Sequence, residues 1–100
     1  MLRRGDKFKC DNERRKYTVQ AADARFVIAT KPSFGTYIYT ITDLDRGVRG
    51  ACNSIFGPPS NLSTEDGAAE ALRLLQSGSM EVSSRNFAAL TTAERKQLTL

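Results

Sequence analysis

Hydrophobic and polar positions alternate through the first third of the chain, which predicts a series of short β-strands. Residues 7–11 and 16–21 alternate on either side of a polar turn over 12–15, the pattern of a β-hairpin with one buried face. The apolar run 25–30 then predicts a third, more central strand. We expect it to stop at Pro32, because proline cannot donate a hydrogen bond to a sheet.

The strongest strand signal is the segment 36–42, in which every residue is β-branched or aromatic. One face of this strand would carry Tyr37, Tyr39 and Ile41, and the other Ile38 and the three threonines. A turn over 43–47 leads to a further strand over 48–56, interrupted by Gly50. Strands that follow one another as hairpins predict a mostly antiparallel sheet.

Two helices are predicted in the second half. Ser63 is suited to an N-cap, Gly78 can end the helix, and Ala68, Ala71, Leu72 and Leu75 form one apolar stripe that would pack on the sheet. Thr91 and Glu94 have the spacing of a capping box for a short C-terminal helix, whose apolar anchors would be Ala93 and Leu98.

These elements predict an α+β fold: a mostly antiparallel sheet of about five strands, one packed helix and a short C-terminal helix. Residues 80–82 could add a last short strand. With 100 residues, of which 40% are hydrophobic and 26% charged, the chain has the size and composition of one globular domain, which we assign to 1–100.

The chain lacks the residue patterns of membrane and secreted proteins. No apolar run approaches the roughly 20 residues needed to cross a bilayer, and residues 1–12 are too charged for a signal peptide. We therefore expect a cytoplasmic protein with no membrane partner. Cys10 and Cys52 are far apart in sequence, so two reduced, buried thiols are expected and not a disulfide.

Catalytic and metal-binding patterns are also missing. The chain has no histidine, which removes the commonest general base, the usual Ser and Cys nucleophile pairs and most zinc sites. Gly47 and Gly50 fit neither phosphate-loop motif, and Asp43 with Asp45 is more typical of a turn than of a catalytic dyad. We expect no catalytic residue, no metal and no cofactor, and a protein that acts by binding.

Charge is concentrated at the N-terminus. Residues 1–16 hold seven basic and three acidic side chains, which accounts for the net charge of +4, while the other 84 residues are neutral overall. Such an asymmetry can mark a surface that meets nucleic acid or an acidic protein. The alternative is a solvated edge hairpin, since edge strands are often protected by Lys and Arg against aggregation.

Three residues on the neighbouring strands each allow two interpretations. Arg49 is either an accessible guanidinium for a phosphate or carboxylate, or part of a hairpin turn followed by a bulge at Gly50. Tyr37 and Tyr39 are either a base-stacking platform or one edge of the core. Arg46, in the turn between the two strands, is a further candidate contact.

A series of segments resembles a family of short, mostly uncharacterised proteins from phages, plasmids and other bacterial mobile elements. The resemblance spans roughly residues 5–90, in the order GDKF, KYTV, RFVIATKP, YTITD, GVRG with a following Asn and FG, and EVSSRN. These motifs carry no known chemistry, so no catalytic residue is transferred from the resemblance. It implies instead a role such as that of anti-CRISPR proteins, which inhibit host defence by occupying a surface of the effector complex.

Three kinds of function remain open. The leading hypothesis is an inhibitor that binds a host protein or ribonucleoprotein complex, a CRISPR effector being the expected target. The second is a small basic nucleic-acid-binding accessory or regulatory protein, and the third is an assembly subunit with a self-complementary edge. The candidate partner-binding residues are Arg3, Arg4, Arg14, Arg15, Lys16, Tyr37, Tyr39, Arg46 and Arg49.

Overall fold

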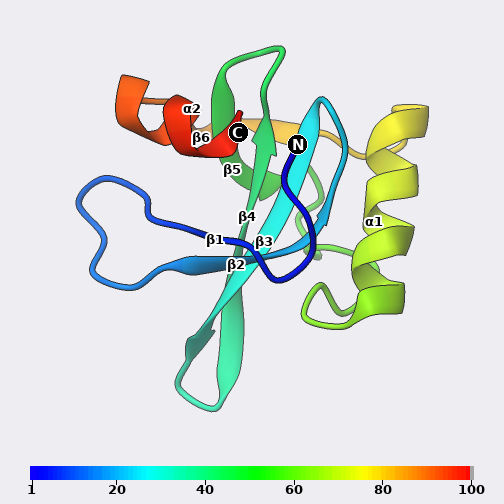
Figure 1. The fold of residues 1–100 in the computed structure, drawn as a ribbon. Helices are drawn as coiled ribbons and strands as arrows, with labels where there is room; N and C mark the ends of the chain where they lie inside the picture. The colour runs from blue at the N-terminus through cyan, green and yellow to red at the C-terminus, as the bar shows by residue number, and fades with distance from the viewer. Residues whose placement is uncertain (100) are drawn as a thin grey trace.

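A computed structural model describes residues 1–99 and shows an α+β fold built on one antiparallel sheet of six strands (Figure 1). The strands lie in chain order across the sheet: β1 (Lys7–Phe8), β2 (Tyr17–Ala22), β3 (Phe26–Ser33), β4 (Thr36–Asp43), β5 (Val48–Cys52) and β6 (Val82–Ala89). The main helix α1 (Glu65–Ser77) enters between β5 and β6, and α2 (Thr92–Leu98) follows β6. The predicted fold class is confirmed, with six strands where about five were expected.

Each face of the sheet covers its own hydrophobic core. The core under α1 includes Ile28, Ile41, Leu62, Ala71 and Leu75. The core on the opposite face includes Phe8, Tyr17, Val27, Ala29 and Leu98 of α2. β3 contributes to both, because successive side chains point to opposite faces, and this explains why its sequence is a continuous apolar run.

Helix α1 begins one residue later than expected. Thr64, not Ser63, is the N-cap, and its hydroxyl accepts a hydrogen bond from Gly67 N. The Ser63 hydroxyl donates to Asn61 Oδ1 in the preceding turn, so it is unavailable to the helix. Gly78 ends the helix in the left-handed conformation, as predicted. Of the predicted stripe, Ala68, Ala71 and Leu75 are buried and Leu72 is partly buried.

Three predicted strand boundaries are wrong. β3 runs through Pro32 to Ser33, because β2 stops pairing at Thr30 and leaves Pro32 no hydrogen bond to lose on that side. β5 ends at Cys52 and does not reach 56. β6 begins at Val82 and continues to Ala89, well beyond the expected 80–82. Most of β6 is exposed, so its sequence has no hydrophobic alternation to reveal it.

The first hairpin is much looser than its alternation predicted. β1 has two residues, and the connection 9–16 leaves the sheet to pack against α2. Lys9 exchanges two hydrogen bonds with the Gln97 side chain, at 3.0 and 2.9 Å. The capping box of α2 at Thr91 and Glu94 is confirmed. The predicted anchor Ala93 is exposed, and Glu94 takes its place as the second buried residue beside Leu98.

Candidate binding surface

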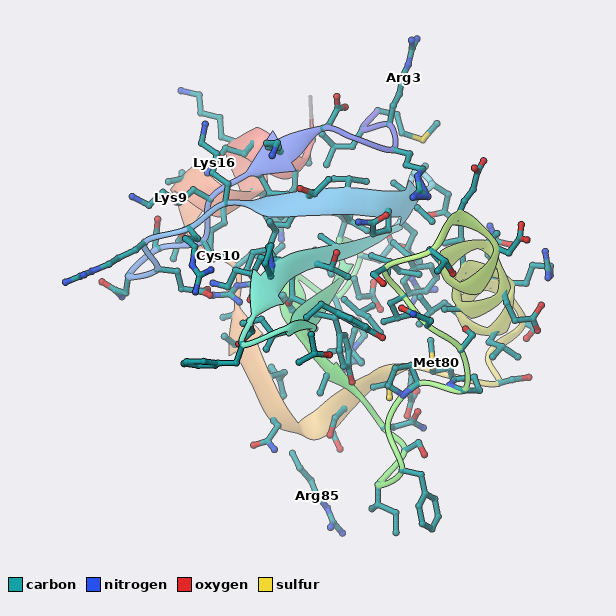
Figure 2. The ribbon with its side chains drawn as sticks, turned by 90° about the horizontal axis from the view of Figure 1, so that it is seen from below. Arg3, Lys9, Cys10, Lys16, Met80 and Arg85 are labelled. Carbon is teal, nitrogen blue, oxygen red and sulfur yellow. The ribbon has the colours of Figure 1, made fainter. Side chains whose placement is uncertain are left out.

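The basic residues of the N-terminal segment all lie at the surface. None of the seven forms an ion pair with another residue among 1–99, and Figure 2 shows Arg3, Lys9 and Lys16 along one side of the molecule with Arg85 on the other. Lys7 lies on the end strand β1, and the other six lie in the segments just before and after it. Their charges are therefore available to a partner.

Helix α2 extends this surface. The hydrogen bonds between Lys9 and Gln97 hold the helix against the first connection, and Arg95 and Lys96 are both exposed. We call the combined set the basic edge: Arg3, Arg4, Lys7, Lys9, Arg14, Arg15, Lys16, Arg95 and Lys96. The contribution of α2 was missed from the sequence, because the pairing of this helix with the first connection has no local signal.

Two acidic residues next to the basic edge are neutralised inside the fold. Glu13 accepts from Lys31 Nζ at 2.5 Å, from Arg49 Nη2 at 3.1 Å and from the Tyr17 hydroxyl at 3.1 Å. Glu94 forms an ion pair with Arg49 Nε at 3.3 Å, although that N–H is not aimed at an acceptor. We call these five residues the buried ion-pair cluster. Within residues 1–16 and 91–99, the segments that carry the basic edge, the exposed acidic side chains are Asp6 and Asp11.

Burial and the charges of the cluster shift the pKa values of Glu13, Tyr17 and the neighbouring Cys10. Burial opposes ionisation of Glu13, but hydrogen bonds from Lys31 and Tyr17 and the charges of Lys31 and Arg49 outweigh it and hold the pKa of Glu13 below its usual value. Burial, reinforced by the Glu13 charge, raises the pKa of Tyr17. Burial likewise raises the pKa of the Cys10 thiol to about 12. Glu13 is thus held charged, and Tyr17 and Cys10 are held neutral.

The interpretation of Arg49 as an accessible guanidinium is overturned. Its side chain is 17% exposed and is committed to Glu13 and Glu94. The alternative, a turn followed by a bulge, is observed: Gly47 has a φ of 68°, and the register between β5 and β6 shifts after Gly50. Arg49 holds α2 and the first connection onto the sheet.

The two tyrosines and Arg46 also make contacts within the fold. Tyr37 and Tyr39 pack at the margin of the core under α1, where the Tyr37 hydroxyl accepts from Leu62 N at 3.1 Å and the Tyr39 hydroxyl accepts from Cys52 N at 3.2 Å. These contacts favour the core-edge interpretation over a stacking platform. Arg46 is exposed and donates to the carbonyl of Val82 at 3.0 Å, joining the β4–β5 turn to β6.

The turn acids have structural partners. Both carboxylate oxygens of Asp43 accept from Arg25, at 3.0 Å each, and one also accepts from the backbone N–H groups of Asp45 and Arg46. Burial opposes the ionisation of Asp43, but these donors outweigh it and hold the pKa below its usual value. The carboxylate is therefore a turn-former, as its position in the sequence indicated.

Among residues 1–99, no three His, Cys, Asp or Glu side chains gather into a possible metal site. Within the same range, no helix has the length and apolar character to span a membrane. A depression of about 550 Å³ lies between the end of β5 and the irregular part of β6, and Arg85 is the charged residue among those lining it. With one charged residue in its lining, this depression is a weaker candidate site than the basic edge.

Comparison with protein-family models, curated proteins and solved structures found no match for this chain. The surface therefore has to be interpreted from its own charge and geometry. Its distinctive property is a set of exposed cations whose acidic neighbours are paired in the interior.

Proposed function

We propose that this protein is a non-enzymatic binding protein of the bacterial cytoplasm that contacts the phosphate backbone of nucleic acid through its basic edge. One observation carries the proposal: the Lys and Arg side chains of the basic edge are exposed and form no ion pair among residues 1–99, while Glu13 and Glu94 are paired with Lys31 and Arg49. Cations that neutralise phosphates release condensed counterions, which supplies much of the free energy of nucleic-acid binding.

The arrangement favours phosphate contacts over base readout. The cations lie on an irregular segment, a two-residue strand and a helix of seven residues, none of which is a regular element long enough to fill a groove. Helix α1 is the longer element, but it carries Glu65 and Asp66 in its first turn, where they would repel phosphate. We therefore expect binding with little sequence preference and a steep dependence on salt.

The test is fluorescence anisotropy with labelled single-stranded and duplex oligonucleotides over a series of salt concentrations. In a variant carrying Arg14→Glu and Arg15→Glu, affinity should fall for all sequences alike. The slope of log K against log salt should also become shallower, by about 0.9 for each duplex phosphate that the variant no longer neutralises. Arg85→Glu is the control for net charge, which it lowers by two units against four in the double variant, because Arg85 is also exposed but lies on the opposite side (Figure 2).

Two results would contradict the proposal. One is an absence of binding by the wild-type protein to either oligonucleotide at low salt. The other is an equal loss of affinity in the Arg85→Glu control and the double variant, since it would make net charge, and not the basic edge, responsible.

A second candidate is an anti-CRISPR-type inhibitor that binds a host protein or ribonucleoprotein. It is favoured by the loop after β5, where Ile55 and Phe56 are 90% and 91% exposed. Exposed aromatic and aliphatic side chains are typical anchors of protein interfaces. If this candidate is correct, a CRISPR effector subunit should be captured after nuclease treatment, and Ile55→Ser with Phe56→Ser should abolish capture while Arg14→Glu with Arg15→Glu should not.

A further inference from the structure

Open sheet edges attract other strands, and most edges of this sheet are protected. β1 is two residues long, begins with Lys7 and is followed by Lys9. β6 is interrupted by an irregular stretch between its pairings at Val82 and Phe87 and carries Arg85 there. Short strands, positive charges and bulges are the usual protections against edge-to-edge pairing.

One edge lacks all of these protections. β4 pairs with β5 only at Ile41, Thr42 and Asp43, so its residues 36–40 have no neighbouring strand on that side. Beyond Gly50 the β5 backbone turns away, and Cys52 N donates to the Tyr39 side chain at 3.2 Å and not to the β4 backbone. Figure 1 shows this part of the β3–β4 hairpin projecting from the rest of the sheet.

The other strand of the projecting hairpin is protected, which makes the contrast sharper. β3 loses its pairing with β2 beyond Thr30, and the residue that then faces outward is Pro32, which has no N–H to offer. Along β4, the N–H and C=O groups of successive residues point alternately toward β3 and away from it. Thr36 pairs with Ser33 at the turn and points toward β3, so the backbone groups of Tyr37 and Tyr39 point outward. The segment 36–40 contains no charge, no proline and no glycine. Thr36 and Ile38 are exposed, Tyr37 and Tyr39 are partly exposed, and Thr40 is buried at 2% exposure.

The sequence of this edge is complementary to itself. Thr36, Tyr37, Ile38, Tyr39 and Thr40 read the same in both directions. Two antiparallel copies related by a twofold axis at Ile38 would therefore place Ile38 opposite Ile38 and Tyr37 opposite Tyr39. At the ends of the paired segment, the exposed Thr36 would lie opposite Thr40, whose side chain is buried within its own chain. Aromatic and Thr–Thr cross-strand pairs are favourable, and a twofold interface requires this kind of self-complementarity.

We propose that two copies of this chain associate through residues 36–40 of β4, extending the two sheets across a twofold axis. The outward backbone groups of Tyr37 and Tyr39 would bond to Tyr39 and Tyr37 of the second copy. The two Ile38 side chains, each 43% exposed in a single chain, would pack against each other. This association is independent of the proposed nucleic-acid binding, because no residue of the basic edge takes part in it.

The first test is the molar mass in solution, measured by light scattering and sedimentation over a wide concentration range. The wild-type protein should approach twice the 11.0 kDa of one chain as its concentration rises. Ile38→Lys places two like charges opposite each other and should give the monomer mass. Phe87→Lys is the matched control, an exposed apolar residue of β6 with 48% exposure, and should leave the dimer intact.

A cysteine variant tests the twofold register. Ile38 would form a non-hydrogen-bonded pair, whose Cα atoms lie about 4.5 Å apart, within reach of a disulfide. Ile38→Cys should therefore give a disulfide-linked dimer under mild oxidation. Thr36→Cys should not, because its copies would be about 13 Å apart along the strands. Cys10 and Cys52 are buried and should not interfere.

A wild-type monomer at all concentrations would overturn the proposal, as would an equal loss of the dimer in the Phe87→Lys control. A dimer that persists in Ile38→Lys would place the interface elsewhere. Equal crosslinking of the Ile38→Cys and Thr36→Cys variants would reject the twofold at Ile38.

Discussion

At the scale of single residues, the buried carboxylate of Glu94 contacts three separate parts of the chain. Its side chain is 2% exposed, accepts from Thr91 N at 3.0 Å and Asp11 N at 2.9 Å, and pairs with Arg49. The cost of removing a carboxylate from water is large and is offset only when its oxygens have such partners. Glu94 therefore joins α2 to both the first connection and β5.

Glu94→Ala should lower the free energy of unfolding by about 3–5 kcal/mol, because it leaves the Asp11 and Thr91 N–H groups and part of the Arg49 charge without a partner. Urea unfolding followed by circular dichroism measures the change. Glu70→Ala, at an exposed pair with Arg73 on α1, is the control and should change stability by about 0.5 kcal/mol or less. Equal effects at both positions would contradict the structural role of Glu94.

At the scale of elements, the packing of α1 depends on one close approach in its first turn. A Cβ at Gly67 would meet the carbonyl oxygen of Asn61, in the loop that leads into the helix. The same loop bonds to this turn through Ser60, whose hydroxyl donates to Gly67 O at 2.7 Å. The loop therefore packs directly against the helix backbone at residue 67, where only glycine leaves room for the Asn61 carbonyl.

Gly67→Ala should therefore destabilise the protein by about 1–3 kcal/mol, the usual cost of overpacking, although alanine is the better helix former by about 1 kcal/mol. The midpoint of thermal unfolding measures the effect. Arg73→Ala, on the exposed side of the same helix, gives the comparison and should be nearly neutral. If Gly67→Ala were stabilising, helix propensity and not the loop contact would govern this turn.

At the scale of the whole molecule, three carboxylates connect separate elements. Glu13 joins the first connection to β3 and β5, and Asp43 joins β4 to Arg25. Asp23 joins the β2–β3 turn to α1 through Gln76 Nε2, at 2.9 Å. Burial opposes the ionisation of all three, but their hydrogen bonds and neighbouring cations outweigh it and hold each pKa below its usual value. The charged forms are thus favoured in the folded state.

Stability should consequently decline on the acid side. A carboxylate whose pKa is lowered by folding stabilises the protein above its ordinary pKa, here 4.5 for Glu13 and 3.8 for the two aspartates, and this stabilisation is lost as the pH falls through the folded value. Urea midpoints should change little through these groups from pH 7 to 5 and then fall toward pH 3. An acid profile without such a fall would contradict the pairing of the three acids.

The sequence by itself determined the elements whose contacts are local or periodic. The β-branched and aromatic residues of 36–42 predicted β4. The apolar stripe and Gly78 predicted α1, and the capping box predicted the start of α2. These signals are readable because each one depends on residues a few positions apart. The distribution of charge also separated the N-terminal segment from a neutral remainder, which located most of the basic edge.

Only the tertiary structure decided which charges reach a partner. Glu13 pairs with Lys31 and Arg49, which lie 18 and 36 residues away, and Asp11 meets Glu94 across 83 residues. No local sequence pattern indicates contacts over such separations. The sequence therefore could not show that Arg49 is partly buried and ion-paired, that α2 adds to the basic edge or that β4 extends beyond its pairing with β5. Whether a charged side chain is buried depends on the residues that pack against it, and here those residues are distant in sequence and are brought together only by the tertiary fold.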